Sequence, residues 1–190
     1  MSLITVLLYL KEMKNFKVTD RDTGKEYWIS RSMAVAGFIV AVDEENELYV
    51  LLERRGPGCP DNVGKLCGVC GYIDYDETRI DAMLRETYEE TGFDLKTANC
   101  LEFYDLGIKD DEFEGKQNIT QRYMILTDLE GLSQRFEDGT INTRTEERGG
   151  EKDEVSEFVI LPYSEIEDMS PDEFAFGHKE VIDKIIEDYF

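Results

Sequence analysis

Residues 71–93 read GYIDYDETRIDAMLRETYEETGF, and this stretch decides which fold we expect for the chain. Between residues 78 and 91, the side chains of one face recur at the spacing of an α-helix. These positions are Ile80, Met83, Leu84, Thr87 and Tyr88. Gly92 supplies a stop after the last turn, and Asp76 or Thr78 can cap the first turn. The stretch therefore predicts a helix that follows a glycine-bearing loop and packs its apolar stripe against a sheet.

The same helix carries three glutamates on one side. Glu86, Glu89 and Glu90 stand at i, i+3 and i+4, away from the apolar stripe, and Glu77 lies where the chain enters the helix. Arg85 precedes Glu89 by one turn, which is the less favourable order for a stabilising ion pair. A solvated acidic face is one interpretation. The other is a site for Mg²⁺ or Mn²⁺, because these cations bind hard carboxylate oxygens.

The spacing of these residues resembles the motif of the Nudix (MutT-like) hydrolases. That motif is Gly, five residues, Glu, seven residues, and then R-E-U-x-E-E-x-G-U, where U is a bulky aliphatic residue. Here every glycine and charged position of the motif is present, and the positions are Gly71, Glu77, Arg85, Glu86, Glu89, Glu90 and Gly92. The two departures are Thr87 and Phe93, which replace aliphatic residues. Many members also have Pro-Gly-Gly ending at the first motif residue, where this chain has Val69-Cys70-Gly71.

The resemblance implies a metal-dependent hydrolase in which water attacks a phosphorus atom. It assigns metal binding to Glu86, Glu89 and Glu90, with Glu77 as a further or water-mediated ligand and the carbonyl of Gly71 as a backbone ligand. Arg85 is expected to orient a motif glutamate through a charge-assisted hydrogen bond.

The general base of the expected reaction stays open between two places in the chain. It is either a motif glutamate, with Glu89 as the catalytic candidate, or a residue of a later loop, where Glu151 and Glu154 are the candidates. The loop glutamates are equally well explained as solvated side chains. Arg54, Arg55 and Lys65 are candidates for contacts to substrate phosphates, although basic residues near strand ends are often only solvated.

The rest of the chain reads as a mixed α/β (α+β type) domain. Expected elements are a hairpin over 16–30, strands over 33–42, 48–54, 122–127 and 158–161, and a final helix over 171–190. Residues 137–153 are long, polar and charged, which indicates a loop. With the resemblance, these elements predict a Nudix-fold α/β/α sandwich with a mixed sheet over residues 32–190. Residues 1–31 form an N-terminal extension with the β-hairpin.

Composition limits the partners of the chain. In its 190 residues, 21 Lys and Arg stand against 43 Asp and Glu, which gives a formal net charge of −22. Such a charge disfavours binding to nucleic acid polymers and to anionic membranes. Four cysteines in a chain of this length do not indicate a disulfide framework, and the apolar run over residues 3–10 is too short to span a bilayer. We expect a soluble, cytoplasmic protein whose partner is a small nucleoside diphosphate derivative.

Several alternatives remain at this point. An isomerase of the isopentenyl diphosphate class shares the fold and a metal site, and Cys67 keeps this reading open. A non-catalytic nucleotide-binding domain of the same fold is the second alternative.

Cys67 and Cys70 form a C-x-x-C pair, which lacks a second pair for a structural zinc site. His178, the only histidine, is expected to pack or cap at the last helix. The sequence also leaves open a homodimer through the hairpin.

Overall fold

The computed structural model describes residues 16–29, 32–96, 102–110 and 118–190. A two-stranded sheet and a seven-stranded sheet account for all of the described strands. The strands are β1 (Phe16–Thr19), β2 (Glu26–Ile29), β3 (Met33–Val42), β4 (Leu48–Arg55), β5 (Leu66–Cys67), β6 (Val69–Tyr72), β7 (Glu102–Asp110), β8 (Ile119–Asp128) and β9 (Val155–Pro162). The helices are α2 (Arg79–Thr91), α3 (Leu129–Glu137), α4 (Tyr163–Asp168) and α5 (His178–Tyr189), with 3-10 turns η1 (Thr145–Arg148) and η2 (Pro171–Glu173).

Strand β3 is the centre of the large sheet. Its apolar run is buried from Ala34 to Ala41, as expected for a strand covered on both faces. Along one edge β3 pairs antiparallel with β4 and β6, and along the other it pairs parallel with β8 over ten residues. The order is β5-β4-β3-β8-β7, with β6 on β3 and β9 on β4. A parallel pair needs a crossover connection, and the chain between β3 and β8 carries helix α2.

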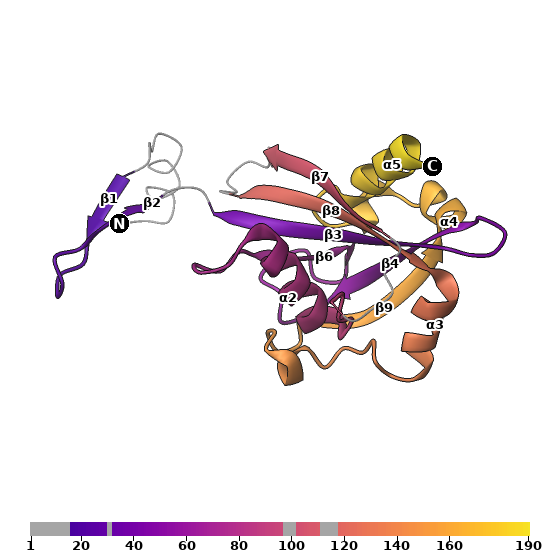
Figure 1. Ribbon diagram of the computed structural model, residues 1–190, viewed down its shortest axis with the longest axis horizontal. Helices are drawn as coiled ribbons and strands as arrows, with labels where there is room; N and C mark the ends of the chain where they lie inside the picture. Colours follow the sequence, from indigo (N-terminus) through magenta and orange to yellow (C-terminus); the bar gives the residue numbers. More distant parts are fainter. Residues whose placement is uncertain (1–15, 30–31, 97–101, 111–117) are drawn as a thin grey trace.

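Helices cover both faces of the sheet and give the α/β/α layers that the sequence predicted (Figure 1). One apolar cluster joins β3 to α2 and α3 through Met83 and Leu132. The other joins the opposite face of the sheet to α4 and α5 through Ile166 and Ile182. The predicted hairpin is confirmed as β1 and β2, which pair only with each other among the described strands.

Helix α2 begins and ends where the sequence indicated. Thr78 is the N-cap, and its hydroxyl accepts a hydrogen bond from the backbone N–H of Asp81 at 3.2 Å. Gly92 adopts the left-handed conformation with φ of 82° and donates its N–H to the carbonyl of Tyr88. This geometry favours glycine, because a side chain at positive φ is strained.

The buried face of α2 differs from the expected apolar stripe. Ile80 and Tyr88 are 54% and 45% exposed, so these two members of the stripe point to solvent. The buried residues are Ala82, Met83, Glu86, Thr87, Glu90 and Thr91. Small and polar side chains on this face let the helix approach the sheet closely, and a Cβ on Gly37 of β3 would lie 2.7 Å from Met83 Cε. The prediction that the glutamates lie away from the buried side is therefore wrong for Glu86 and Glu90.

Other boundaries also need correction. The final helix begins at His178 rather than at residue 171, because Pro171–Glu173 forms a separate 3-10 turn capped by Ser170. Strand β7 and helix α3 were not predicted, and β8 and β9 extend beyond the expected ranges. Residues 137–153 are mainly loop as predicted, with one 3-10 turn. The apolar run over 3–10 and Cys100 lie outside the described residues.

Candidate active site

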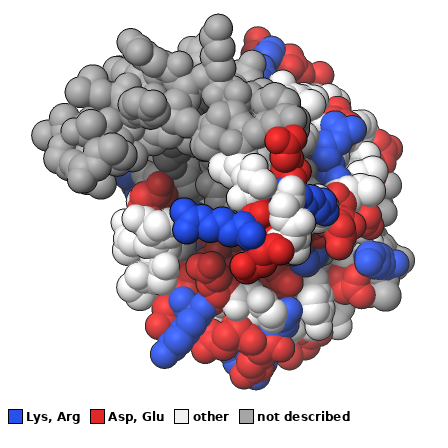
Figure 2. Space-filling model, turned by 90° about the vertical axis from the view of Figure 1, so that its left-hand side faces the viewer, with Lys and Arg blue, Asp and Glu red and all other residues white. Residues whose placement is uncertain are grey.

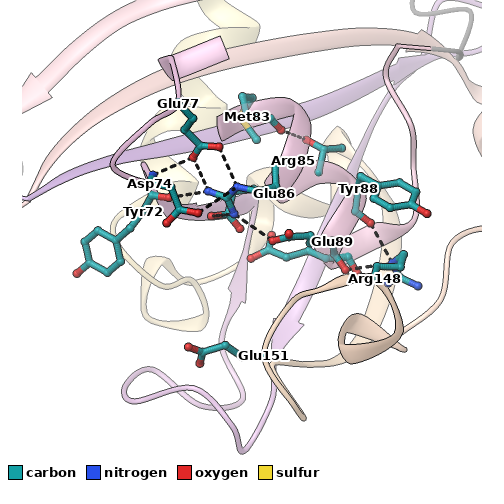
Figure 3. Close-up of polar contacts among 12 residues, drawn as sticks. Tyr72, Asp74, Glu77, Met83, Arg85, Glu86, Tyr88, Glu89, Arg148 and Glu151 are labelled. Carbon is teal, nitrogen blue, oxygen red and sulfur yellow. Dashed lines mark hydrogen bonds and ion pairs between the residues drawn. The ribbon is translucent and has the colours of Figure 1, made fainter. Parts of the chain in front are cut away.

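Arg85 stands at the centre of the carboxylates that the sequence singled out (Figure 3). Its Nε and Nη2 donate to the two oxygens of Glu77 at 2.9 and 2.6 Å. Its Nη1 donates to Glu86 Oε1 at 2.8 Å and to Glu89 Oε2 at 3.0 Å, and Nη2 also donates to the carbonyl of Tyr72 at 2.9 Å. The structure thus shows the expected bond from Arg85 to a motif glutamate, and it adds two more carboxylates to the same guanidinium.

Glu77 is held on all sides by these contacts. Besides its two bonds to Arg85, it accepts the backbone N–H of Asp74 at 2.9 Å through Oε2. The hydrogen bond from Arg85 lowers the pKa of Glu77, which keeps this carboxylate ionised. Both of its oxygens are therefore engaged in fixing Arg85 and the loop before α2.

Gly71 brings the loop backbone against a glutamate of the helix. A Cβ at this position would lie 2.1 Å from Glu86 Oε1 and 2.2 Å from Glu86 Cδ. Real side chains do not approach this closely, so only glycine leaves room for the carboxylate here. Residue 71 belongs to β6, which packs on α2, and its backbone lies beside the carboxylate predicted to bind metal.

Two further carboxylates, one on α2 and one on the sheet, are almost fully buried. Glu90 is 1% exposed, and its Oε2 accepts the backbone N–H of Cys70 at 3.0 Å. Glu53, on β4, is 2% exposed, and its Oε1 accepts a hydrogen bond from Cys67 Sγ at 3.2 Å. Glu53 Oε2 has no hydrogen-bond partner among the described residues. Burial raises the pKa of both carboxyl groups, and the charge of Glu53 raises the pKa of Glu90 further.

Glu86 and Glu154 extend this acidic cluster. Burial raises the pKa of Glu86 to about 7, and this effect outweighs the adjacent Arg85, which lowers it. Burial also raises the pKa of Glu154, a half-buried residue just before β9. The charge of Glu154 contributes in turn to the raised pKa of Glu53, Glu86 and Glu90. The charge of this loop carboxylate therefore acts on the helix carboxylates, which is consistent with one of the two base hypotheses.

Glu151 is placed differently from Glu154. Its side chain is exposed, and its backbone N–H donates to Glu154 Oε2 at 3.3 Å. Figure 3 shows the Glu151 side chain apart from the carboxylates that contact Arg85. Of the two loop candidates, Glu154 is the one that is half-buried and whose charge raises the pKa of Glu53, Glu86 and Glu90.

The donor set of this cluster fits a hard divalent cation. Several carboxylates lie close enough to raise one another's pKa, and a cation would offset this repulsion. Buried Glu53 Oε2, which lacks a partner in the described structure, indicates a surplus of oxygen acceptors at the same place. Across the described ranges, no three metal-ligating side chains already converge on one point. Arg85 instead engages Glu77, Glu86 and Glu89.

The basic residues expected at phosphates separate into two groups. Arg54 and Arg55 lie on either side of an irregularity in the pairing of β4 with β9. Arg54 is directed to Glu157 and to the carbonyl of Gly64. Arg55 is 7% exposed and donates to the carbonyl of Asp61. Lys65 is half-buried, and its backbone carbonyl accepts the N–H of Arg55.

His178 has the packing role that the sequence analysis favoured. It is 3% exposed, and its Nδ1 accepts the backbone N–H of Gly68 at 3.1 Å. Its ring contacts Phe38 edge-on, with the centroids 5.0 Å apart. Burial lowers the pKa of His178 to about 3, so the ring is neutral in the folded chain.

The sequence analysis missed two residues of this region, Glu53 and Arg148. Glu53 lies within the strand expected over residues 48–54, and the sequence analysis assigned it no role. Arg148 lies in the charged loop and donates hydrogen bonds to the end of α2. A carboxylate inside a buried strand was the available signal for Glu53. Arg148 had no local signal except the Gly149-Gly150 pair that follows it.

Comparison with known families decides what this site belongs to. A family model described as the NUDIX domain matches residues 32–185. The chain belongs to the Nudix family. The prediction of a Nudix hydrolase is thereby confirmed, and the matched range contains the cluster around Arg85. No curated protein matches this Nudix chain. Among the described residues, no helix is long and apolar enough to cross a membrane.

Solved structures share the Nudix fold at low sequence identity. The NUDIX domain of Shewanella oneidensis NrtR, complexed with ADP ribose, matches with a TM-score of 0.57 and 17% identity over 98% of each chain. A mutT/nudix family protein from Listeria innocua matches with a TM-score of 0.58 and 19% identity, covering 84% of this chain and 94% of that one. A bifunctional NMN adenylyltransferase/ADP ribose pyrophosphatase from Francisella tularensis matches with a TM-score of 0.58 and 16% identity, covering 95% of this chain and 44% of that one.

Proposed function

We propose that this Nudix hydrolase cleaves a phosphoanhydride bond in a nucleoside diphosphate linked to a second moiety, with Mg²⁺ or Mn²⁺ as its cofactor. The observation that carries the proposal is the cluster around Arg85, in which all motif carboxylates are present and two of them are buried. Burying several carboxylates together lowers the stability of the fold. Such a cluster therefore indicates a site for binding or catalysis. Glu86, Glu89 and Glu90 would hold the metal, together with the carbonyl of Gly71.

The metal would neutralise the diphosphate and activate the attacking water when bound. The chain supplies the positions of the ligands. Arg85 orients Glu86 and Glu89 from the same helix, and Glu77 fixes Arg85 through two parallel hydrogen bonds. Because both oxygens of Glu77 are engaged, we infer that its part in metal binding is through Arg85 or through water.

Glu154 is our candidate for the general base. It is half-buried beside Glu86 and Glu90, and its raised pKa brings it nearer to the working pH of a base than an exposed carboxylate. Glu151 supports it by donating a backbone N–H to its Oε2. Glu89 remains the motif alternative. The pH–rate profiles of Glu154→Gln and Glu89→Gln decide between these two candidates for the base. Only the variant that lacks the base should lose the acidic limb of the profile while its metal affinity is unchanged.

ADP-ribose is the first substrate to test. The Shewanella NUDIX domain was crystallised with ADP ribose, and the Francisella protein is described as an ADP ribose pyrophosphatase. Arg55, whose charge lowers the pKa of Glu154, is the first basic residue to test for a contact to phosphate. Arg54 and Lys65 stay weaker candidates.

We also infer partners and location from charge and cysteines. Figure 2 shows acidic and basic side chains mixed over the described part of one face, without a continuous basic surface. With the net charge of −22, this supports a small-molecule partner rather than a nucleic acid polymer or a membrane. The free thiols Cys59, Cys67 and Cys70 support a cytoplasmic location. A homodimer through the hairpin and a domain boundary after residue 31 remain predictions.

The test is a panel of nucleoside diphosphate derivatives with Mg²⁺, Mn²⁺ or EDTA, followed by mass analysis of the products. Metal-dependent release of two phosphate-containing products supports the hydrolase. Glu90→Gln should lower this turnover by about 100-fold or more, whereas Glu130→Gln, a change at an exposed residue of α3, should not. Ligand binding without turnover would favour the binding-domain alternative. Rearrangement of isopentenyl diphosphate, lost in Cys67→Ala, would favour the isomerase.

A further inference from the structure

Arg148 lies where the loop of Glu154 meets the helix of the motif glutamates. It is the last residue of η1, in the segment that joins α3 to β9. Its guanidinium points at the C-terminal end of α2 and bonds to backbone carbonyls there (Figure 3). The backbone of that end carries Glu89 and Glu90.

Its hydrogen bonds cap the last turn of α2. Nε donates to the carbonyls of Tyr88 and Glu89 at 2.9 and 3.1 Å, and Nη2 donates to the carbonyl of Glu90 at 2.8 Å. The last carbonyls of a helix lack partners inside the helix and form the negative end of its dipole. Helix α2 has no basic residue of its own in the last turn. Arg148 supplies this charge from another part of the chain.

The same guanidinium also fixes its own loop. Nη1 donates to Asn142 Oδ1 at 2.8 Å, and Nη2 donates to the Asn142 carbonyl at 2.9 Å. The backbone N–H of Asn142 in turn donates to the carbonyl of Thr91 at 3.3 Å. The loop therefore donates hydrogen bonds to all of the last four carbonyls of α2. Arg148 is the residue that bonds both to the helix and to Asn142 of its own loop.

The chain that follows Arg148 passes directly over Glu89. Gly149 has φ of 104°, and a Cβ there would lie 3.1 Å from Glu89 Oε1. A Cβ on Gly150 would lie 3.6 Å from Glu89 Cβ. Next, the hydroxyl of Thr145 donates to the carbonyl of Glu151 at 2.5 Å, which holds the turn that leads to Glu154. Residues 148–154 are therefore held by Arg148 at α2 and by Thr145 at Glu151.

We propose that Arg148 is a positioning residue that sets the place of Glu154 relative to Glu89 and Glu90. The assignment rests on the proposed function, in which these helix glutamates hold the metal and Glu154 is the base. Arg148 acts through the backbone of two segments and does not touch the substrate. Its loss would let the loop move away from the helix while leaving the metal ligands on α2.

The first test compares Arg148→Ala and Arg148→Lys with a matched control, Arg144→Ala. Arg144 lies in the same loop, its side chain is 61% exposed, and it bonds to Glu147 and Asn142 rather than to α2. Displacing a catalytic group by about 1 Å costs about 100-fold in rate. We expect Arg148→Ala to lower kcat by about 10- to 100-fold with KM changed less than about threefold, at a temperature where every variant is folded. Lysine should recover little of the loss, because one ammonium cannot bridge the carbonyls and Asn142 together.

A double variant and a measurement without substrate complete the test. If Arg148 acts through Glu154, Arg148→Ala should add almost nothing to the loss in Glu154→Gln. Amide exchange over residues 149–154 should be about tenfold faster in Arg148→Ala and unchanged in Arg144→Ala. Equal kcat and exchange in Arg148→Ala and Arg144→Ala would overturn the assignment, and so would additive losses with Glu154→Gln. A parent protein without turnover would reject the proposed function, and the exchange data would still decide whether Arg148 fixes the loop.

Discussion

Gly71→Ala is the substitution whose effect follows most directly from the geometry of the site. The new methyl group would lie 2.1 Å from Glu86 Oε1, so the carboxylate has to retreat by about 1 Å to reach an ordinary contact distance. This retreat disturbs the 2.8 Å bond from Arg85 Nη1 to Glu86. The backbone at residue 71 has no positive φ, so the clash is the dominant effect.

The expected cost differs between activity and stability. A 1 Å displacement of a metal ligand should lower kcat/KM by about 100-fold. Crowding the buried side chain of Glu86 should lower the free energy of unfolding by about 1–3 kcal/mol. Metal-dependent turnover gives the first quantity, and denaturant unfolding in EDTA gives the second. A weaker affinity for Mn²⁺, measured by calorimetry on the folded variant, should accompany the loss of rate.

A double-mutant cycle with Glu86→Ala identifies the clash itself. In the Glu86→Ala background the carboxylate is gone, so Gly71→Ala should change the free energy of unfolding by less than about 0.5 kcal/mol. If Gly71→Ala costs the same in both backgrounds, the close approach to Glu86 is not the reason for glycine at this position. The same conclusion follows if Gly71→Ala alone keeps its kcat/KM within threefold of the parent.

Three further predictions follow from the titratable groups. Glu90→Gln should lower turnover by about 100-fold or more and weaken Mn²⁺ binding, without lowering the melting temperature in EDTA, because burial disfavours the charged carboxylate and glutamine keeps the acceptor for Cys70 N–H. Glu154→Gln should lower kcat at least tenfold, whereas Glu151→Gln should change it less than about threefold, and equal effects would contradict the assignment of the base. The pKa of His178 is about 3 in the fold against 6.5 in the unfolded chain, so the unfolded state takes up the proton first as the pH falls below 6.5. Lowering the pH from 7 to 5 should therefore reduce the free energy of unfolding of the parent by about 2 kcal/mol, and His178→Gln should not show this loss. Identical pH slopes for the two proteins in denaturant titrations would refute the prediction.

The parts of the fold that could be predicted are those written into short stretches of sequence. The run of β3 is apolar because both faces are covered, and the ends of α2 are marked by Thr78 and Gly92. The motif carboxylates and Arg85 were found because their spacing on one helix is fixed. Each of these signals depends on residues that are neighbours in the chain.

The parts that could not be predicted depend on contacts between distant segments. The buried face of α2 was misjudged because a helix is assumed to bury its apolar side, and here the sheet covers Glu86 and Glu90 instead. Glu53 lies in a strand that was predicted, but its burial beside Cys67 depends on how the other segments of the fold pack on β4. The bonds from Arg148 to α2 join residues about sixty positions apart, and they are invisible until the loop is folded.

The parallel pairing of β3 with β8 has a consequence for how the chain folds. Met33 pairs with Ile119, so the segment that contains α2 is enclosed in a large loop that has to close before the central sheet exists. Long-range strand pairing is slow, because chain entropy is lost before the contacts form. Until closure, Glu86 and Glu90 repel each other on an isolated helix and lack the Cys70 amide that holds Glu90. The acidic cluster is therefore assembled late, and a divalent cation that binds it should act chiefly by slowing unfolding of the completed domain.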